Sequence, residues 1–204
     1  MSFDEIVHCL SAEDQKTVRE MTALFESIGR QTRQFAAETG LKCETGCGTC
    51  CANPDIETTV AEVLPLAVYL WSISQADDAL RTRPSAGACV FYKPDPAVKG
   101  HGRCGIYAYR PGLCRLFGFA ANRDKYGRRT LATCKVIRES QAQACAHGLS
   151  LKLVAILKIM ESFGTRTSAG HARLGCLNVP AMHLLGGLRR QLDLLPRSQG
   201  MRSQ

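Results

Sequence analysis

The sequence has no long apolar stretch. No run approaches the roughly 18 consecutive apolar residues of a membrane-spanning helix, because Lys152 and Lys158 interrupt the most apolar segment, residues 149–160. The N-terminus carries acidic residues early and has neither the basic region nor the apolar core of a secretory signal. These absences argue against a membrane span and against export, so we predict a cytoplasmic protein.

Familiar catalytic and nucleotide-binding patterns are also missing. The chain shows no Ser-His-Asp arrangement, no glycine-rich phosphate loop and no dinucleotide fingerprint. It shows no RNA-stacking motif and no zinc-finger helix signature either. The sequence therefore leaves open whether the protein is an enzyme, and catalysis would have to depend on a bound metal.

Cysteine, by contrast, is abundant, with 11 among 204 residues. Such a count indicates either a disulfide framework or metal ligation, and the redox compartment decides between them. A chain of this length can bury an apolar core without covalent cross-links. In a reducing cytosol, grouped cysteines usually hold metal, so we expect a metal-binding protein.

The chain carries a formal net charge of +8 with its thiols counted as neutral. Four thiolates around a divalent ion, or around a cubane cluster of charge +2, leave a net charge of about −2 that nearby cations would offset. Basic residues do surround the cysteines: Lys42, Arg103, Arg110, Arg115, Arg123, Arg128 and Arg129. An acidic partner is the alternative. We favour charge compensation, so nucleic acid is an unlikely partner, whereas an unknown protein partner is possible.

Two helices are well marked near the N-terminus. Ser11 is a plausible N-cap of a long amphipathic helix that continues to about Glu38 and ends at Gly40. Thr58 or Thr59 caps a second helix, and Glu62 follows Thr59 at the spacing of a capping box.

The remaining patterns complete a mainly α fold. We predict a single helical domain around a loop-rich cysteine metal centre, with little or no sheet. Segment 103–119 is expected to contain a short strand or extended piece that leads into a turn at 110–112, and 125–128 a hairpin or turn. Helices are expected over 135–146, 149–163 and 179–195. The chain is accordingly divided into an N-terminal helical segment (1–40), a cysteine-cluster metal-binding core (41–135), C-terminal helices (136–195) and a disordered tail (196–204).

The most informative segment reads Cys43-Glu-Thr-Gly-Cys47-Gly-Thr-Cys50-Cys51. Thiolates two or three residues apart can turn inward onto one metal ion, and the intervening glycines permit the tight turns that this requires. The adjacent side chains of Cys50 and Cys51 diverge, so these two residues either serve two metals or one of them packs. Four cysteines within nine residues predict a metal site.

Cys89, Cys104, Cys114 and Cys134 follow, spaced by loops. The sequence Cys104-Gly-Ile-Tyr107-Ala-Tyr-Arg110-Pro111-Gly-Leu-Cys114-Arg115-Leu-Phe117 resembles the second signature of the YkgJ-like cysteine-cluster family, described as a zinc- or iron-chelating domain. The first signature of that family, C-x3-C-x2-C-C followed by an extended stretch and a helix containing Glu, is similar to residues 43–51 and then 56–62. The resemblance covers about residues 43–134.

The resemblance implies a site of eight cysteines: Cys43, Cys47, Cys50, Cys51, Cys89, Cys104, Cys114 and Cys134. A flagellin lysine methylase, which looks as if it shares the first signature, is associated with an iron–sulfur cluster. This favours an iron–sulfur cluster of the 4Fe-4S type, with zinc as the alternative. No methyl-donor site is visible, so the methylase activity is not carried over. Cys9, Cys145 and Cys176 fall outside both signatures, and we expect them to be small buried hydrophobes.

Polar side chains beside the second signature have two interpretations. Arg110 and Arg115 either donate hydrogen bonds to cluster sulfurs, which would tune a reduction potential, or cap helix carbonyls and pair with carboxylates. Tyr107 is expected to pack its ring in the core. His101, between two glycines, is a weaker ligand candidate.

Three functions fit these patterns. The first is an iron- or iron–sulfur-binding protein with a redox, metal-handling or assembly role. The second is a zinc-stabilised interaction module, and the third a metal-dependent enzyme. Thiolate ligation suits both zinc and iron–sulfur clusters, so the residues alone leave the metal open.

Overall fold

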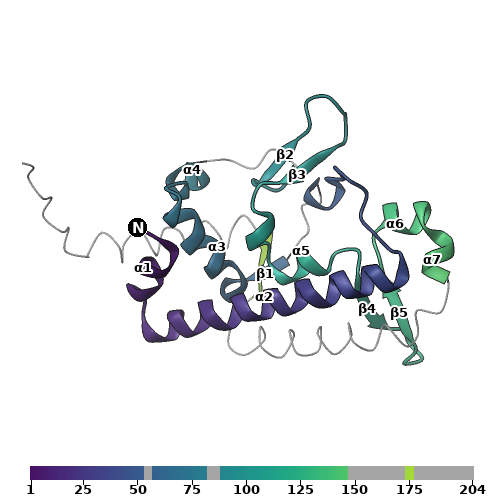
Figure 1. Cartoon of the computed structure of the whole chain (residues 1–204), viewed down its shortest axis with the longest axis horizontal. Helices are drawn as coiled ribbons and strands as arrows, with labels where there is room; N and C mark the ends of the chain where they lie inside the picture. The colour runs from purple at the N-terminus through teal and green to yellow at the C-terminus, as the bar shows by residue number, and fades with distance from the viewer. Residues whose placement is uncertain (53–56, 82–87, 147–172, 177–204) are drawn as a thin grey trace, which may run out of the picture.

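Helix α2 (Ala12–Thr39) runs along the length of the molecule (Figure 1), and three of the shorter helices pack against it, α1 (Phe3–His8), α3 (Val60–Ser72) and α5 (Gly112–Leu116). It begins where the Ser11 side chain accepts a hydrogen bond from the Asp14 backbone N–H. It ends at Gly40, whose left-handed φ of 75° closes the last turn. The long helix predicted from the apolar periodicity is therefore confirmed.

The computed structural model describes residues 1–52, 57–81, 88–146 and 173–176. Besides α2, the helices are α1 (Phe3–His8), α3 (Val60–Ser72), α4 (Ala76–Arg81), α5 (Gly112–Leu116), α6 (Lys135–Ser140) and α7 (Ala142–Ala146), with short 3-10 turns η1 (Thr49–Ala52) and η2 (Tyr107–Tyr109). The strands are β1 (Glu57–Thr59), β2 (Tyr92–Pro94), β3 (Gly102–Cys104), β4 (Ala120–Arg123), β5 (Arg129–Ala132) and β6 (Arg173–Cys176). They form three two-stranded antiparallel sheets, so the prediction of a mainly α fold with little sheet is confirmed.

Helix α3 begins with the predicted capping box. The Thr59 side chain accepts from the Glu62 N–H, and the Glu62 carboxylate accepts from the Thr59 N–H. A second capping box, formed by Ser2 and Glu5, starts α1, which the apolar pattern had not predicted because six residues show too little periodicity. Ile6 of α1 packs into the same buried cluster as the apolar face of α3.

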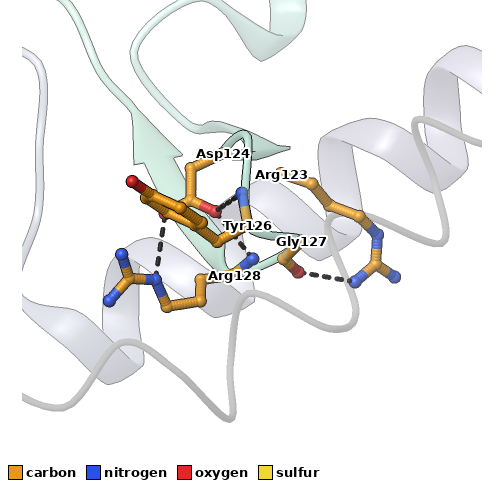
Figure 2. Close-up of polar contacts among 5 residues, drawn as sticks. All are labelled: Arg123, Asp124, Tyr126, Gly127 and Arg128. Atoms are coloured by element: carbon orange, nitrogen blue, oxygen red, sulfur yellow. Dashed lines mark hydrogen bonds and ion pairs between the residues drawn. The ribbon is translucent and has the colours of Figure 1, made fainter.

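The predicted turn at 125–128 is the tip of the β4–β5 hairpin (Figure 2). Asp124 Oδ1 accepts hydrogen bonds from the backbone N–H groups of Tyr126 and Arg128, at 2.8 and 2.9 Å. Gly127 has a left-handed φ of 77°, a conformation that glycine adopts without strain. The turn is therefore built by local side-chain-to-backbone bonds, which is why the sequence predicts it well.

Other predictions are refined by the structure. The short strand predicted in segment 103–119 is present as β3, but η2 and α5 occupy much of the rest of the segment. The helix predicted over 135–146 is interrupted at Gln141, between α6 and α7. Strand β1 pairs with β6, more than a hundred residues away in the chain. The helices predicted at 149–163 and 179–195 and the tail 196–204 lie outside the described residues, and the division of the chain into four segments stays a prediction.

In the part of the chain that the structure describes, the buried apolar residues form three clusters. One joins α1 to α3, one joins the middle of α2 to α5, and one joins the end of α2 to β4 and α6. Among the described helices, none combines the length and apolarity needed to cross a membrane. The C-terminal half of α2 and the elements around α5 frame the cysteine-rich loops.

Candidate metal centre

Seven of the eight predicted cysteine ligands line one cavity of about 350 Å³. They are Cys43, Cys47, Cys50, Cys51, Cys89, Cys104 and Cys114, and they come from both cysteine signatures and the segment between them. The same wall contains Arg103, Arg110 and Arg115, and the aromatic rings of Tyr107, Phe117 and Phe119. The fold thus gathers soft sulfur donors beside cations that can offset thiolate charge.

Backbone hydrogen bonds join the first signature to the chain that follows it. Cys89 N donates to Cys51 O at 2.9 Å, and Gly102 N donates to Gly46 O at 2.8 Å. An isolated β-bridge pairs Cys47 with His101. These contacts place the loop of residues 43–51 against the β2–β3 hairpin, and so bring Cys89 and Cys104 to the first group of cysteines.

Glycines allow this close approach. Gly46 has a φ of +77°, and a Cβ atom there would lie 3.2 Å from Nδ1 of His101. The ring of Tyr92 lies between Gly48 and Gly102: a Cβ atom at either glycine would come within 2.4 Å of Tyr92 Cε2. The Tyr92 hydroxyl donates to His101 O at 2.9 Å. The Tyr92 ring thereby sets the distance between the loop of residues 43–51 and strand β3.

The second signature forms η2 and α5, which contribute Tyr107 and Cys114 to the same wall. The Arg110 guanidinium lies 3.6 Å from the centroid of the Tyr107 ring, and Arg110 Nε donates to Tyr107 O at 3.2 Å. Tyr107 is 66% exposed, so the expectation that its ring packs in the core is wrong. Its place at the edge of the cavity, stacked beneath a guanidinium, explains the exposure.

Arg115 is held by backbone carbonyls. Its Nε donates to Arg110 O at 2.7 Å, another guanidinium nitrogen donates to Ala108 O, and the guanidinium lies over the Phe25 ring. Burial lowers the pKa of Arg115 to about 10. The structure therefore shows Arg115 donating hydrogen bonds to backbone carbonyls, which is one of the two interpretations drawn from the sequence. Donation by Arg115 to the sulfurs of a bound cluster stays a prediction.

The eighth cysteine, Cys134, lies outside the cavity wall but close enough to Cys43 to affect its charge. It caps α6, where its Sγ accepts from Ile137 N at 3.4 Å. Gln141, at the end of α6, binds both polar backbone groups of Lys42: Lys42 N donates to Gln141 Oε1 at 3.0 Å, and Gln141 Nε2 donates to Lys42 O at 2.7 Å. This clamp holds the start of the cysteine loop against the helix that Cys134 begins.

The thiols influence one another strongly. The pKa of Cys50 is lowered to about 6 and that of Cys104 to about 7, in each case chiefly because the Cys51 thiol donates a hydrogen bond, with the charge of Arg110 adding to the effect. The pKa of Cys51 is raised, because its proton is shared with Cys104 and Cys50. The hydrogen bonds from Cys51 thus make the thiolate forms of Cys50 and Cys104 easier to reach than in a free thiol.

Two further thiols resist ionisation. Burial, followed by the charges of neighbouring cysteines, raises the pKa of Cys43 to about 11 and that of Cys114 to about 12. Mutual repulsion of this kind is expected where thiolates crowd together without a cation between them. A bound metal would relieve it, because metal ligation stabilises the deprotonated thiol.

Within the described residues, no three Cys, His, Asp or Glu side chains are arranged to hold one metal ion. Binding of a single ion would therefore need some thiols to change rotamer. The chemistry of the donor set nevertheless fits zinc and iron–sulfur clusters, both of which are bound by thiolates. The seven cysteines of the wall exceed the four that one structural zinc ion requires.

Cys9 and Cys145, which fall outside the signatures, are half-buried and are not part of the cavity wall. Cys9 is the C-cap of α1, and Cys145 of α7 packs beside Cys134 in the cluster at the end of α2. Cys176 pairs through its backbone with Glu57. His101, which the sequence made a weaker candidate, faces Gly46 and is not part of the cavity wall.

Comparison with known proteins agrees with the site. Residues 42–146, about half of the chain, match the family CxxCxxCC, described as "Putative zinc- or iron-chelating domain". This range contains all the cysteines of the cavity wall and Cys134. No curated protein and no solved structure matches the chain. The chain therefore belongs to the CxxCxxCC family of zinc- or iron-chelating domains.

Proposed function

We propose that the protein binds iron as an iron–sulfur cluster, with 4Fe-4S favoured, through the cysteines of the cavity, and that it has a redox, metal-handling or assembly role. The observation that carries the proposal is the gathering of seven cysteines and three arginines around one cavity of about 350 Å³. The thiols surround a volume, whereas no three of the described ligand side chains are set for a single ion. A polynuclear cluster suits such a site better than one tetrahedral ion does.

The protein's own residues would supply ligation and charge balance. The pKa values of Cys50 and Cys104 are both lowered, and the charge of Arg110 contributes to each shift. A bound cluster would supply one-electron chemistry or a store of iron and sulfide. Phe117, Phe119 and Ile106 add apolar surface to the wall, and limited access of water is one of the factors that set a cluster's potential.

The experiment is anaerobic purification of the full chain, followed by iron, zinc and acid-labile sulfide analysis and by electron paramagnetic resonance before and after reduction. We expect a brown protein with iron and sulfide in equal amounts. A colourless protein that contains zinc and no sulfide would reject the iron–sulfur assignment.

That second outcome would support the alternative, a zinc-stabilised interaction module. The observation that favours it is local: Cys47 and Cys50 are separated by two residues and lie in consecutive tight turns, the spacing of many structural zinc sites. A metal-dependent enzyme is the third candidate, and an unfilled coordination position found by spectroscopy would favour it.

The charge of Arg110 leads to a prediction about potential. Reduction adds negative charge to a thiolate-bound cluster, and a nearby cation stabilises that state. Arg110 acts on Cys50, Cys104 and Cys114, so Arg110→Gln is expected to lower the reduction potential by on the order of 50 mV, equivalent to roughly 1 kcal/mol for one electron. Arg115→Gln is also expected to lower it, but by less, because that guanidinium is bound to carbonyls.

Protein-film voltammetry of the wild type and both variants, matched for iron content, checks this prediction. Equal potentials in the wild type and the Arg110 variant would contradict it. The absence of any redox wave in the wild type would reject an electron-transfer function and would favour a structural role for the metal.

A further inference from the structure

Glu62 carries a buried carboxyl group whose presence is not explained by a direct contribution to the cavity wall. It lies in the first turn of α3 and is 3% exposed, one of three buried polar residues in the part of the chain that the structure describes. Its side chain is not part of the cavity wall. A carboxyl group in such a place is retained when its oxygens satisfy hydrogen-bond donors that would otherwise lack partners.

The two carboxylate oxygens bind two different segments. Oε2 accepts from the backbone N–H of Thr59 at 2.9 Å and from the Thr59 hydroxyl at 2.9 Å, which completes the capping box of α3. Oε1 accepts from the backbone N–H of Gly112 at 3.2 Å, 50 residues further along the chain. One side chain thus connects the segment after the first cysteine signature to the middle of the second.

Gly112 is the first residue of α5, the helix that carries Cys114. The first N–H groups of a helix have no partner within it and need an acceptor from elsewhere. Pro111, the N-cap of α5, makes no side-chain cap hydrogen bond. Glu62 supplies an acceptor in its place, and both Pro111 and Gly112 are buried around this contact. The position of Cys114, two residues on, follows from it.

The arrangement requires a carboxylate. Both oxygens of an ionised Glu accept hydrogen bonds, whereas Gln offers one accepting oxygen and an NH2 group that only donates. A Gln side chain at position 62 would therefore leave either Thr59 N or Gly112 N facing a donor. An unsatisfied donor in a buried place favours movement of the backbone that carries it.

We propose that Glu62 is a positioning residue of the metal centre: its carboxylate caps α3 and α5 together and so holds the Cys114 thiol in the cavity wall beside the cysteines of the first signature. This proposal concerns the same cysteine centre as the proposed function. It rests on that function in one respect, namely that Cys114 is a metal ligand. It holds for zinc and for an iron–sulfur cluster alike.

The test uses the full chain, prepared metal-free under reducing conditions and titrated with Co²⁺ alone. Thiolate-to-cobalt charge-transfer absorption reports the number of bound thiolates, and iodoacetamide followed by peptide mass spectrometry shows which cysteines the metal protects. For Glu62→Gln we expect cobalt affinity to fall roughly 10- to 100-fold, as when a group that orients a ligand is lost. We also expect Cys114 to become reactive while Cys47 and Cys50 stay protected.

A matched variant separates positioning from simple capping. Glu5→Gln alters the equivalent capping box of α1, away from the cavity. It is expected to retain the wild-type spectrum and the protection of Cys114. Wild-type behaviour of Glu62→Gln would overturn the proposal, and so would loss of protection at all cysteines alike or an equal effect of Glu5→Gln.

A parallel alkylation experiment on the metal-free protein distinguishes failure of the Glu62 proposal from failure of the proposed metal-binding function. Without metal, the half-buried Cys114 thiol is held in the cavity wall by the position of α5, so Glu62→Gln should raise its alkylation rate about tenfold, an effect of the size of one lost hydrogen bond. A wild type that binds no Co²⁺ through thiolates would reject metal binding, and the metal-free rates would then decide on the position of Cys114. If the alkylation rate of Cys114 in the metal-free protein were unchanged by Glu62→Gln, the positioning role of Glu62 would be overturned.

Discussion

Replacement of Cys50 by serine is expected to remove most of the bound metal and to produce the largest loss of stability among single substitutions at the centre. Cys50 is coupled to more of the surrounding thiols than any other cysteine whose pKa is shifted: it affects Cys43, Cys51, Cys104 and Cys114. Its pKa of about 6 means that the sulfur is ready to bind metal at neutral pH. A serine hydroxyl stays protonated there and is a poor ligand for a soft site.

The stability change follows from linkage. A metal present at a hundred to a thousand times its dissociation constant stabilises the folded state by about 3–4 kcal/mol, and a variant that no longer binds it loses that contribution. Metal analysis and thermal unfolding of Cys50→Ser measure the two effects, and Cys47→Ser is also expected to lose metal and stability, though less than Cys50→Ser. Cys9→Ser is the control, because Cys9 caps α1 and takes no part in the cavity wall. Full metal content and an unchanged melting temperature in Cys50→Ser would mean that the central assignment is wrong.

The second large effect is expected from Gly48→Ala, which adds one methyl group to the cysteine loop. That methyl group would lie 2.4 Å from Tyr92 Cε2, and the ring is tied in place because its hydroxyl donates to His101 O at 2.9 Å. Relief of the clash therefore requires either that the ring gives up this hydrogen bond or that the loop moves away from β3. Overpacking of this kind typically lowers the free energy of unfolding by about 1–3 kcal/mol. Because the displaced loop carries Cys47 and Cys50, metal affinity should fall with stability.

Gly29→Ala is a matched control. Gly29 lies within α2, and the nearest atom to a new Cβ there is the mobile end of Arg33 at 3.3 Å. Alanine in that helix should stabilise the protein by about 0.5–1 kcal/mol. In the Gly48 variant, a second change of Tyr92→Leu removes the ring atoms that clash and is expected to recover part of the metal binding. Chemical denaturation and metal titration of the variants check both expectations. If the Gly48→Ala protein were as stable as the wild type, the Tyr92 ring would not limit the size of the side chain at position 48.

The features that the sequence predicted correctly are short-range. The cap at Ser11, the left-handed Gly40 and the capping box of Thr59 and Glu62 each depend on residues within four positions of one another. The turn at Asp124 is also made by its own neighbours. Local dihedral preferences and nearby hydrogen bonds determine such elements, so they can be predicted without knowledge of the rest of the chain. The dense spacing of the cysteines and the family they belong to were likewise evident in the sequence.

Tertiary structure decided how the cysteines meet. The cavity joins residues 43 to 114, and its frame depends on contacts that no local pattern specifies, such as Cys89 N to Cys51 O and Gln141 to Lys42 across 99 positions. It also decided that Tyr107 is exposed and that Cys134 lies beside the cavity wall.

The role of Glu62 shows the physical reason for this division. One of its oxygens completes a capping box that the sequence reveals, and the other accepts a hydrogen bond from Gly112, 50 positions away. The first bond is specified by spacing along the helix. The second exists because packing of the buried clusters brings α5 to the start of α3, and the free energy of that packing is a property of the whole folded chain.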